Sequence, residues 1–125
     1  MENKLTNILN RIIKEKGEVL MFAVLKMDEF LDKWTIILSA DWVTEENREN
    51  DFNYLRELLI ESLTSEERST IARIGVLAKS NHLVQLLLQL KTGTKISEDT
   101  RLNGNIIHEG NILVSSNNKE QIDNS

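Results

Sequence analysis

Apolar residues at helical spacing open the chain. Positions three and four apart form one narrow apolar stripe, which predicts an amphipathic helix near the N-terminus (Leu5, Ile8, Leu9, Ile12 and Ile13). Lys14 and Lys16 occupy its last turn, where cations complement the helix dipole. Gly17 is the expected end of this helix, because glycine readily adopts the left-handed conformation that terminates helices.

Two strands are predicted next. Residues 19–25 form a continuous apolar run, which is typical of a strand buried on both faces. After a polar connection at residues 28–33, residues 34–42 carry apolar even positions and mostly polar odd positions, so we expect a strand with one drier face. Trp34 and Trp42 share one parity and are expected to pack in the core under a helix, with a ligand-stacking platform as the alternative.

A second helix is predicted to begin at a Thr44 cap. Glu45 and Glu46 follow at the positive end of its dipole, and one apolar face continues to about Thr64 (Phe52, Leu55, Leu59 and Leu63). Residues 65–69 are then a polar link with room for one short turn.

A third strand and a third helix follow. Residues 70–78 have the apolar content of a strand. Ser80 or Asn81 is the expected cap of a helix that runs to Lys91 and stops at Gly93.

Two tight turns are predicted within residues 100–115. Asn103-Gly104 is a strong hairpin signal, since both residues tolerate positive φ, and Glu109-Gly110 is a weaker second turn. Together they predict a short β-meander over residues 100–115.

The resulting element order is α-β-β-α-β-α-β-β(-β). It predicts an α+β fold, with mixed α/β as the alternative, arranged as a two-layer sandwich in which helices cover at least one sheet face. Residues 34–78 are long enough for a right-handed β-α-β crossover. We expect one globular domain at residues 1–116, a disordered polar tail at residues 117–125, and core positions on the first strand and second helix (Phe22, Val24, Leu55 and Leu59).

Composition narrows the class of protein. The chain has 125 residues, of which 40% are hydrophobic and 28% charged, as in one ordinary domain with a real core. The absence of cysteine excludes disulfides, zinc–thiolate sites, iron–sulfur clusters and thiol nucleophiles. The first residues lack the apolar run of a signal peptide, and no apolar run approaches the roughly 20 residues of a membrane helix. We therefore expect a cytoplasmic protein with no membrane partner, and the abundance of Asn, Ile and Lys favours a prokaryotic one.

Charge and glycine spacing exclude further classes. A net charge of −5 without a basic cluster argues against nucleic acid as the partner. The glycines are too scattered for a phosphate-binding loop, which disfavours nucleotide hydrolysis and dinucleotide redox chemistry. No cofactor is expected.

One polar constellation could carry chemistry. His108 would act as a general base or metal ligand, oriented by Asp99 or Glu109, while Arg101 holds an anionic group. The alternative is that these residues face water around tight turns.

A cluster of three carboxylates has the residue types of a magnesium site. Asp41, Glu45 and Glu46 supply three carboxylates around the end of a predicted strand. Helix capping explains Glu45 and Glu46 without a metal, so we expect no metal centre.

The predicted third helix is unusually apolar. Its hydrophobic residues span an arc of roughly 200°, more than a helix lying on one sheet requires. Val84 and Leu88 provide the surplus apolar surface and are the candidate interface residues of a homodimer or of a complex with another protein.

The sequence thus favours a small acidic protein-interaction or regulatory domain without catalytic activity. The alternative is a small ligand-binding protein or enzyme that uses the region of Asp99, Arg101, His108 and Glu109.

Overall fold

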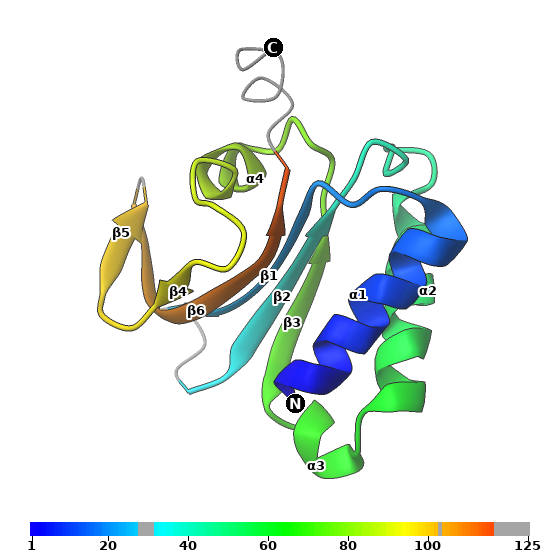
Figure 1. Cartoon of the computed structure of the whole chain (residues 1–125), viewed down its shortest axis with the longest axis horizontal. Helices are drawn as coiled ribbons and strands as arrows, with labels where there is room; N and C mark the ends of the chain where they lie inside the picture. The colour runs from blue at the N-terminus through cyan, green and yellow to red at the C-terminus, as the bar shows by residue number, and fades with distance from the viewer. Residues whose placement is uncertain (28–31, 103, 117–125) are drawn as a thin grey trace.

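A six-stranded mixed sheet forms the centre of the molecule (Figure 1). The computed structural model describes residues 1–27, 32–102 and 104–116. The strand order is β3-β2-β1-β6-β4, and β5 pairs with β6 away from this path. Among the strand pairs of the described residues, only β2–β3 is parallel. The strands are β1 (Met21–Met27), β2 (Trp34–Ser39), β3 (Ile71–Val76), β4 (Lys95–Ile96), β5 (Thr100–Leu102) and β6 (Asn105–Ser115).

Helices lie on both faces of this sheet. Figure 1 shows α1 and α2 side by side on one face and α4 on the other. Together with the mixed sheet, they give the predicted α+β fold, in which α2 lies within the connection between the parallel strands β2 and β3. The helices are α1 (Glu2–Lys16), α2 (Arg48–Ser62), α3 (Ser65–Arg68) and α4 (His82–Leu87), and none of them is long and apolar enough to cross a membrane.

The core on the α1–α2 face is the one that the sequence predicts. Phe22 and Val24 point from β1 toward the helices, and Leu55 and Leu59 reach them from α2. All four are at most 5% exposed. The stripe of α1 is buried as expected except for Ile13, which is 40% exposed, and Gly17 ends the helix with a φ of 114°.

The opposite face holds a second core under α4. Met21, Ala23 and Leu25 alternate with the residues that face α1 and α2, and pack against Val84 and Leu87 of α4. As a result, Thr35 and Ser39 of β2 are fully buried. The expectation of one drier face on this strand is wrong, because helices cover both sides of the sheet.

Both predicted helix boundaries after β2 require correction. The Thr44 hydroxyl accepts a bond from the Asn47 amide at 3.2 Å and closes a turn, so α2 begins only at Arg48. The third helix, capped by Asn81, ends at Leu87 rather than at Lys91. The α-helix does not continue, because the amides of Gln89 and Leu90 donate to the carbonyls three residues earlier, those of Leu86 and Leu87, and so form tight turns.

The C-terminal strands also differ from the expected meander. Gly104 has a φ of 89° and Leu102 pairs with Asn105, as a two-residue hairpin requires, although Asn103 itself lies outside the described residues. Glu109-Gly110 forms no turn, because β6 continues through it and Gly110 pairs with Leu25 and Ile96. Residues 28–31 of the connection predicted at residues 28–33, and the predicted tail at residues 117–125, lie outside the described residues as well.

The two tryptophans occupy different settings. Trp34 begins β2, whereas Trp42 lies in a turn beyond the strand and donates its indole N–H to the carbonyl of Glu18 at 3.0 Å. Both are partly buried and pack against the α1–α2 core, which is the favoured prediction.

Candidate functional site

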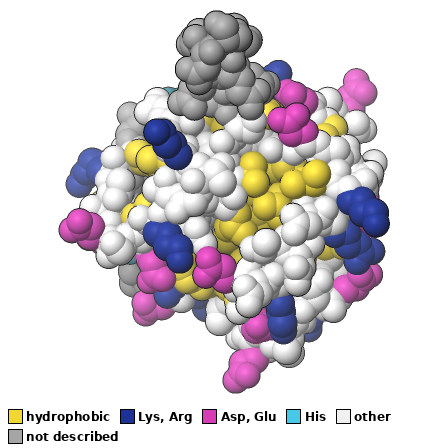
Figure 2. Space-filling model, in the orientation of Figure 1, with side chains coloured by type: hydrophobic (Ala, Val, Ile, Leu, Met, Phe, Trp, Pro, Cys, Tyr) yellow, Lys and Arg dark blue, Asp and Glu magenta, His cyan; other side chains and the backbone are white. Residues whose placement is uncertain are grey.

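A pocket of about 490 Å³ opens where α1 leaves the β6–β4 end of the sheet uncovered. Figure 2 shows hydrophobic side chains exposed in a hollow at the centre of this face. Residues from α1, β1, β2, β4 and β6 line it, together with the residue that precedes α1 and the residue that follows β4 (Met1, Glu2, Leu5, Val24, Trp34, Lys95, Ile96, Ser97, Glu109, Gly110, Asn111 and Leu113).

The start of α1 forms one wall and is tied to α3. Lys4 Nζ lies 2.7 Å from a carboxylate oxygen of Glu67, and the N-terminal amine lies 3.8 Å from the other oxygen. Glu67 also closes a capping box with Thr64. The bond from Lys4 and the backbone bond from Thr64 lower the pKa of Glu67 to about 2. These contacts hold Met1 and the first turn of α1 beside the pocket.

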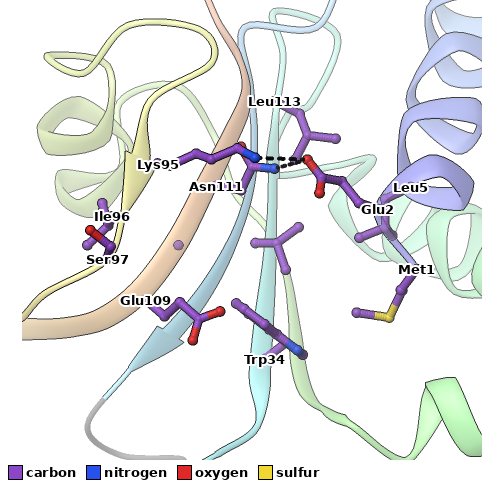
Figure 3. Close-up of a pocket in the computed structure, with 12 residues that line it drawn as sticks. Met1, Glu2, Leu5, Trp34, Lys95, Ile96, Ser97, Glu109, Asn111 and Leu113 are labelled. Carbon is purple, nitrogen blue, oxygen red and sulfur yellow. Dashed lines mark hydrogen bonds and ion pairs between the residues drawn. The ribbon is translucent and has the colours of Figure 1, made fainter.

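The floor and the far wall are apolar. Val24 supplies part of the floor, and Leu5 reaches it from α1. Trp34 and Leu113 are only partly buried, so their side chains present hydrophobic surface to the cavity. In Figure 3, Trp34 lies at one end of the pocket and Leu113 at the other.

Polar groups stand at both ends. At the end near Leu113, Asn111 Nδ2 donates to Glu2 Oε1 at 2.8 Å, and Lys95 Nζ approaches the same oxygen at 3.8 Å (Figure 3). At the other end, the Glu109 carboxylate lies 3.9 Å from Lys26 Nζ.

At the end of the pocket near Lys26, side chains from three neighbouring strands lie side by side. Lys26 pairs directly with Trp34 on β2 and with Glu109 on β6, so the three side chains stand in one row across the sheet. The Lys26 ammonium lies 4.6 Å from the centroid of the Trp34 ring, which is cation–π distance. The row stabilises the sheet and fixes the indole as a rigid wall of the pocket.

Only one of the four polar residues predicted to carry chemistry lines this pocket. Glu109 does, whereas Asp99, Arg101 and His108 belong to the β5–β6 hairpin and its approach. His108 Nδ1 lies 2.7 Å from Asp99 Oδ1, so the expected carboxylate–imidazole pair does form there.

Two of the three carboxylates considered as a metal site, Asp41, Glu45 and Glu46, form ion pairs with cations. Asp41 pairs with Lys79 at 2.9 Å, and Glu45 pairs with Arg48 at 3.7 Å. Within residues 1–27, 32–102 and 104–116, no group of three or more metal-ligating side chains lies together.

The two interface candidates differ in burial. Val84 is fully buried against the sheet and belongs to the chain's own core, since α4 is the helix that covers this face. Leu88 is partly buried at the edge of the same core, so a surface role stays a prediction for Leu88 alone.

Sequence reasoning missed the pocket because its residues are dispersed. Glu2, Lys95 and Asn111 come from three elements far apart along the chain, and each has the pattern of an ordinary exposed polar position. The one usable signal was Trp34, for which a ligand platform was the alternative to a purely structural role.

No protein-family model, curated protein or solved structure matches this chain.

Proposed function

We propose that this chain is a binding domain without catalytic activity whose α1–β6 pocket takes a small, neutral, largely apolar ligand with an aromatic ring. The observation that carries the proposal is the apolar surface that Trp34 and Leu113, packed at the edge of the α1–α2 core, present to a cavity.

Size and shape support a small molecule. A cavity of about 490 Å³ lies within the range of roughly 300–1,000 Å³ that is typical of ligand pockets. Trp34 offers an indole for offset or edge-to-face stacking, the arrangements that aromatic pairs prefer. Leu5 and Val24 give an apolar floor on which the rest of such a ligand is dehydrated.

Charge pairing supports a neutral ligand. Glu2 is bonded to Asn111 and lies beside Lys95, while Glu109 lies beside Lys26. A charged ligand would have to break one of these pairs or face a like charge, whereas a neutral one leaves them in place. Asn111 and Ser97 supply hydrogen-bonding groups at the rim for a ligand hydroxyl or amide.

The wider setting is part of the same proposal. We infer an acidic, cytoplasmic, regulatory protein in which ligand occupancy modulates contact with a protein partner or a second copy of the chain. The net charge of −5 supports the acidic character.

Titration with the neutral fluorescent probe N-phenyl-1-naphthylamine tests the pocket. We expect saturable fluorescence enhancement with one site per chain. Ser97→Tyr places a ring at the exposed rim of the pocket and should weaken binding at least about tenfold. Glu98→Tyr is the matched control, because Glu98 is also exposed but does not line the pocket.

Two results would contradict the proposal. One is the absence of saturable binding by the folded protein. The other is equal weakening by Ser97→Tyr and Glu98→Tyr, which would place the probe elsewhere. Tighter binding of the anionic analogue 8-anilinonaphthalene-1-sulfonate would refute the charge argument in particular.

A further inference from the structure

We propose that the outer edge of β3, together with the groove between β3 and α2, binds an extended acidic segment of a partner protein by strand addition. This inference goes beyond the ligand pocket, because it concerns the opposite end of the sheet.

The first observation is the open edge. β3 is the last strand in the sheet order, and within the described ranges no strand pairs with its outer side. An edge strand presents peptide N–H and C=O groups to which another extended chain can bond. Ala72 and Arg73, in the first half of β3, are exposed, so a second chain can approach the backbone there.

The second observation is a groove beside that edge. A depression of about 490 Å³ lies between α2 and β3, with a floor of apolar side chains (Phe52, Leu59, Ile60, Ile71 and Ile74). Ile60 is 40% exposed, one of two large hydrophobic residues in the described part of the chain with so much exposure. Alternate apolar side chains of an added strand would bury this surface.

The third observation is the charge of the groove. Among the residues that the structure describes, its lining contains Arg56, Arg68 and Arg73 and no carboxylate, although the chain as a whole has a net charge of −5. Arg68 is held in place, since its guanidinium donates to the carbonyls of Ile60 at 3.1 Å and Leu63 at 2.8 Å. Such a local excess of guanidinium groups favours a carboxylate-bearing partner.

The same charges argue against a second copy as the occupant. A two-fold pairing of β3 with β3 would bring the arginines of one chain next to those of the other. Like charges opposed across neighbouring strands are destabilising. An acidic segment whose apolar residues alternate with Glu or Asp would bond to the backbone of β3, cover the apolar floor of the groove and pair its carboxylates with the arginines.

The test uses the full chain and fluorescently labelled synthetic heptapeptides with blocked ends. The first peptide alternates Glu with Val, the second alternates Lys with Val, and the third carries proline at the centre of the Glu–Val sequence. Fluorescence anisotropy should show binding of the first peptide that weakens as salt is added. The lysine peptide should not bind, and the proline peptide should bind more weakly because a backbone donor is lost.

A pair of arginine variants identifies the site. Arg56→Gln combined with Arg73→Gln should weaken binding of the Glu–Val peptide on the order of tenfold. Arg48→Gln combined with Arg101→Gln removes the same charge outside the groove and should leave binding unchanged. Circular dichroism verifies that both double variants are folded.

Three outcomes would overturn the inference. They are the absence of binding by the Glu–Val peptide, equal binding of the lysine peptide, and equal weakening by the two double variants. A homodimer that is strengthened by Arg56→Gln and Arg73→Gln would place a second copy on the edge instead. Because N-phenyl-1-naphthylamine and the peptides are measured separately, failure at β3 leaves the pocket result untouched.

Discussion

Replacing Gly110 with alanine tests the path of β6 along the pocket. Gly110 is buried, and a Cβ built there lies 2.8 Å from Leu25 Cδ2 and 3.4 Å from the carbonyl oxygen of Val24. Leu25 is fully buried, so its side chain has little room to move aside. Overpacking of a tight core costs about 1–3 kcal/mol. The reduced entropy of the unfolded chain offsets about 0.4–1 kcal/mol of that. We expect a net loss of about 1–2 kcal/mol in the free energy of unfolding.

Urea denaturation followed by circular dichroism measures this loss. A double-mutant cycle with Leu25→Val is the sharpest control, since a shorter side chain at position 25 makes room for the new methyl group. The cost of Gly110→Ala should then be smaller by more than about 0.5 kcal/mol in the Leu25→Val background. A Gly110→Ala variant as stable as the wild type would refute the packing, and would favour the open turn at Glu109-Gly110 that the sequence alone suggests.

Three further predictions follow from burial and charge. Leu59→Ala should cost about 2–5 kcal/mol in urea denaturation, because Leu59 is 2% exposed in the α1–α2 core; near-native stability would mean that this face of α2 is misplaced. Burial raises the pKa of Asp51 despite Lys16 Nζ at 3.7 Å, so its ionised form is less favourable in the folded chain than in the unfolded one. Asp51→Asn should therefore raise the melting temperature at neutral pH, with a gain that vanishes as the pH falls below the unfolded pKa of about 3.9; a gain independent of pH would contradict this. Leu88→Glu should leave a folded monomer in sedimentation if Leu88 contributes to a homodimer, whereas unfolding would assign Leu88 to the core.

Local patterns predicted the secondary structure well where one residue type sets the outcome. The apolar stripe of α1, its end at Gly17 and the hairpin at Gly104 all depend on spacing or on positive φ, which are visible in the sequence. Sequence patterns failed to predict the secondary structure where tertiary contacts determine it. Gly110 suits a turn, but here it makes room for Leu25 within a continuous strand.

Burial on both faces of the sheet explains the other differences. Thr35 and Ser39 look like solvent-facing strand positions in the sequence, but both are fully buried in the folded chain. Burial also explains the wide apolar arc that the sequence predicts for the helix now labelled α4. Val84 and Leu87 of this helix pack inside the chain. Of the pocket, the sequence offered only Trp34 as a possible ligand platform, since Glu2, Trp34 and Asn111 meet only once the sheet order is known.

Nuclear magnetic resonance of the ¹⁵N-labelled protein tests the proposed binding pocket most directly. Trp34 lines the pocket, whereas the indole of Trp42 is bonded to Glu18 and does not line it; Trp42→Phe assigns the two indole signals. On titration with N-phenyl-1-naphthylamine, we predict saturable shifts of the Trp34 indole signal and of the amides of Gly110 and Asn111. An unmoved Trp34 signal under saturating probe would contradict the account.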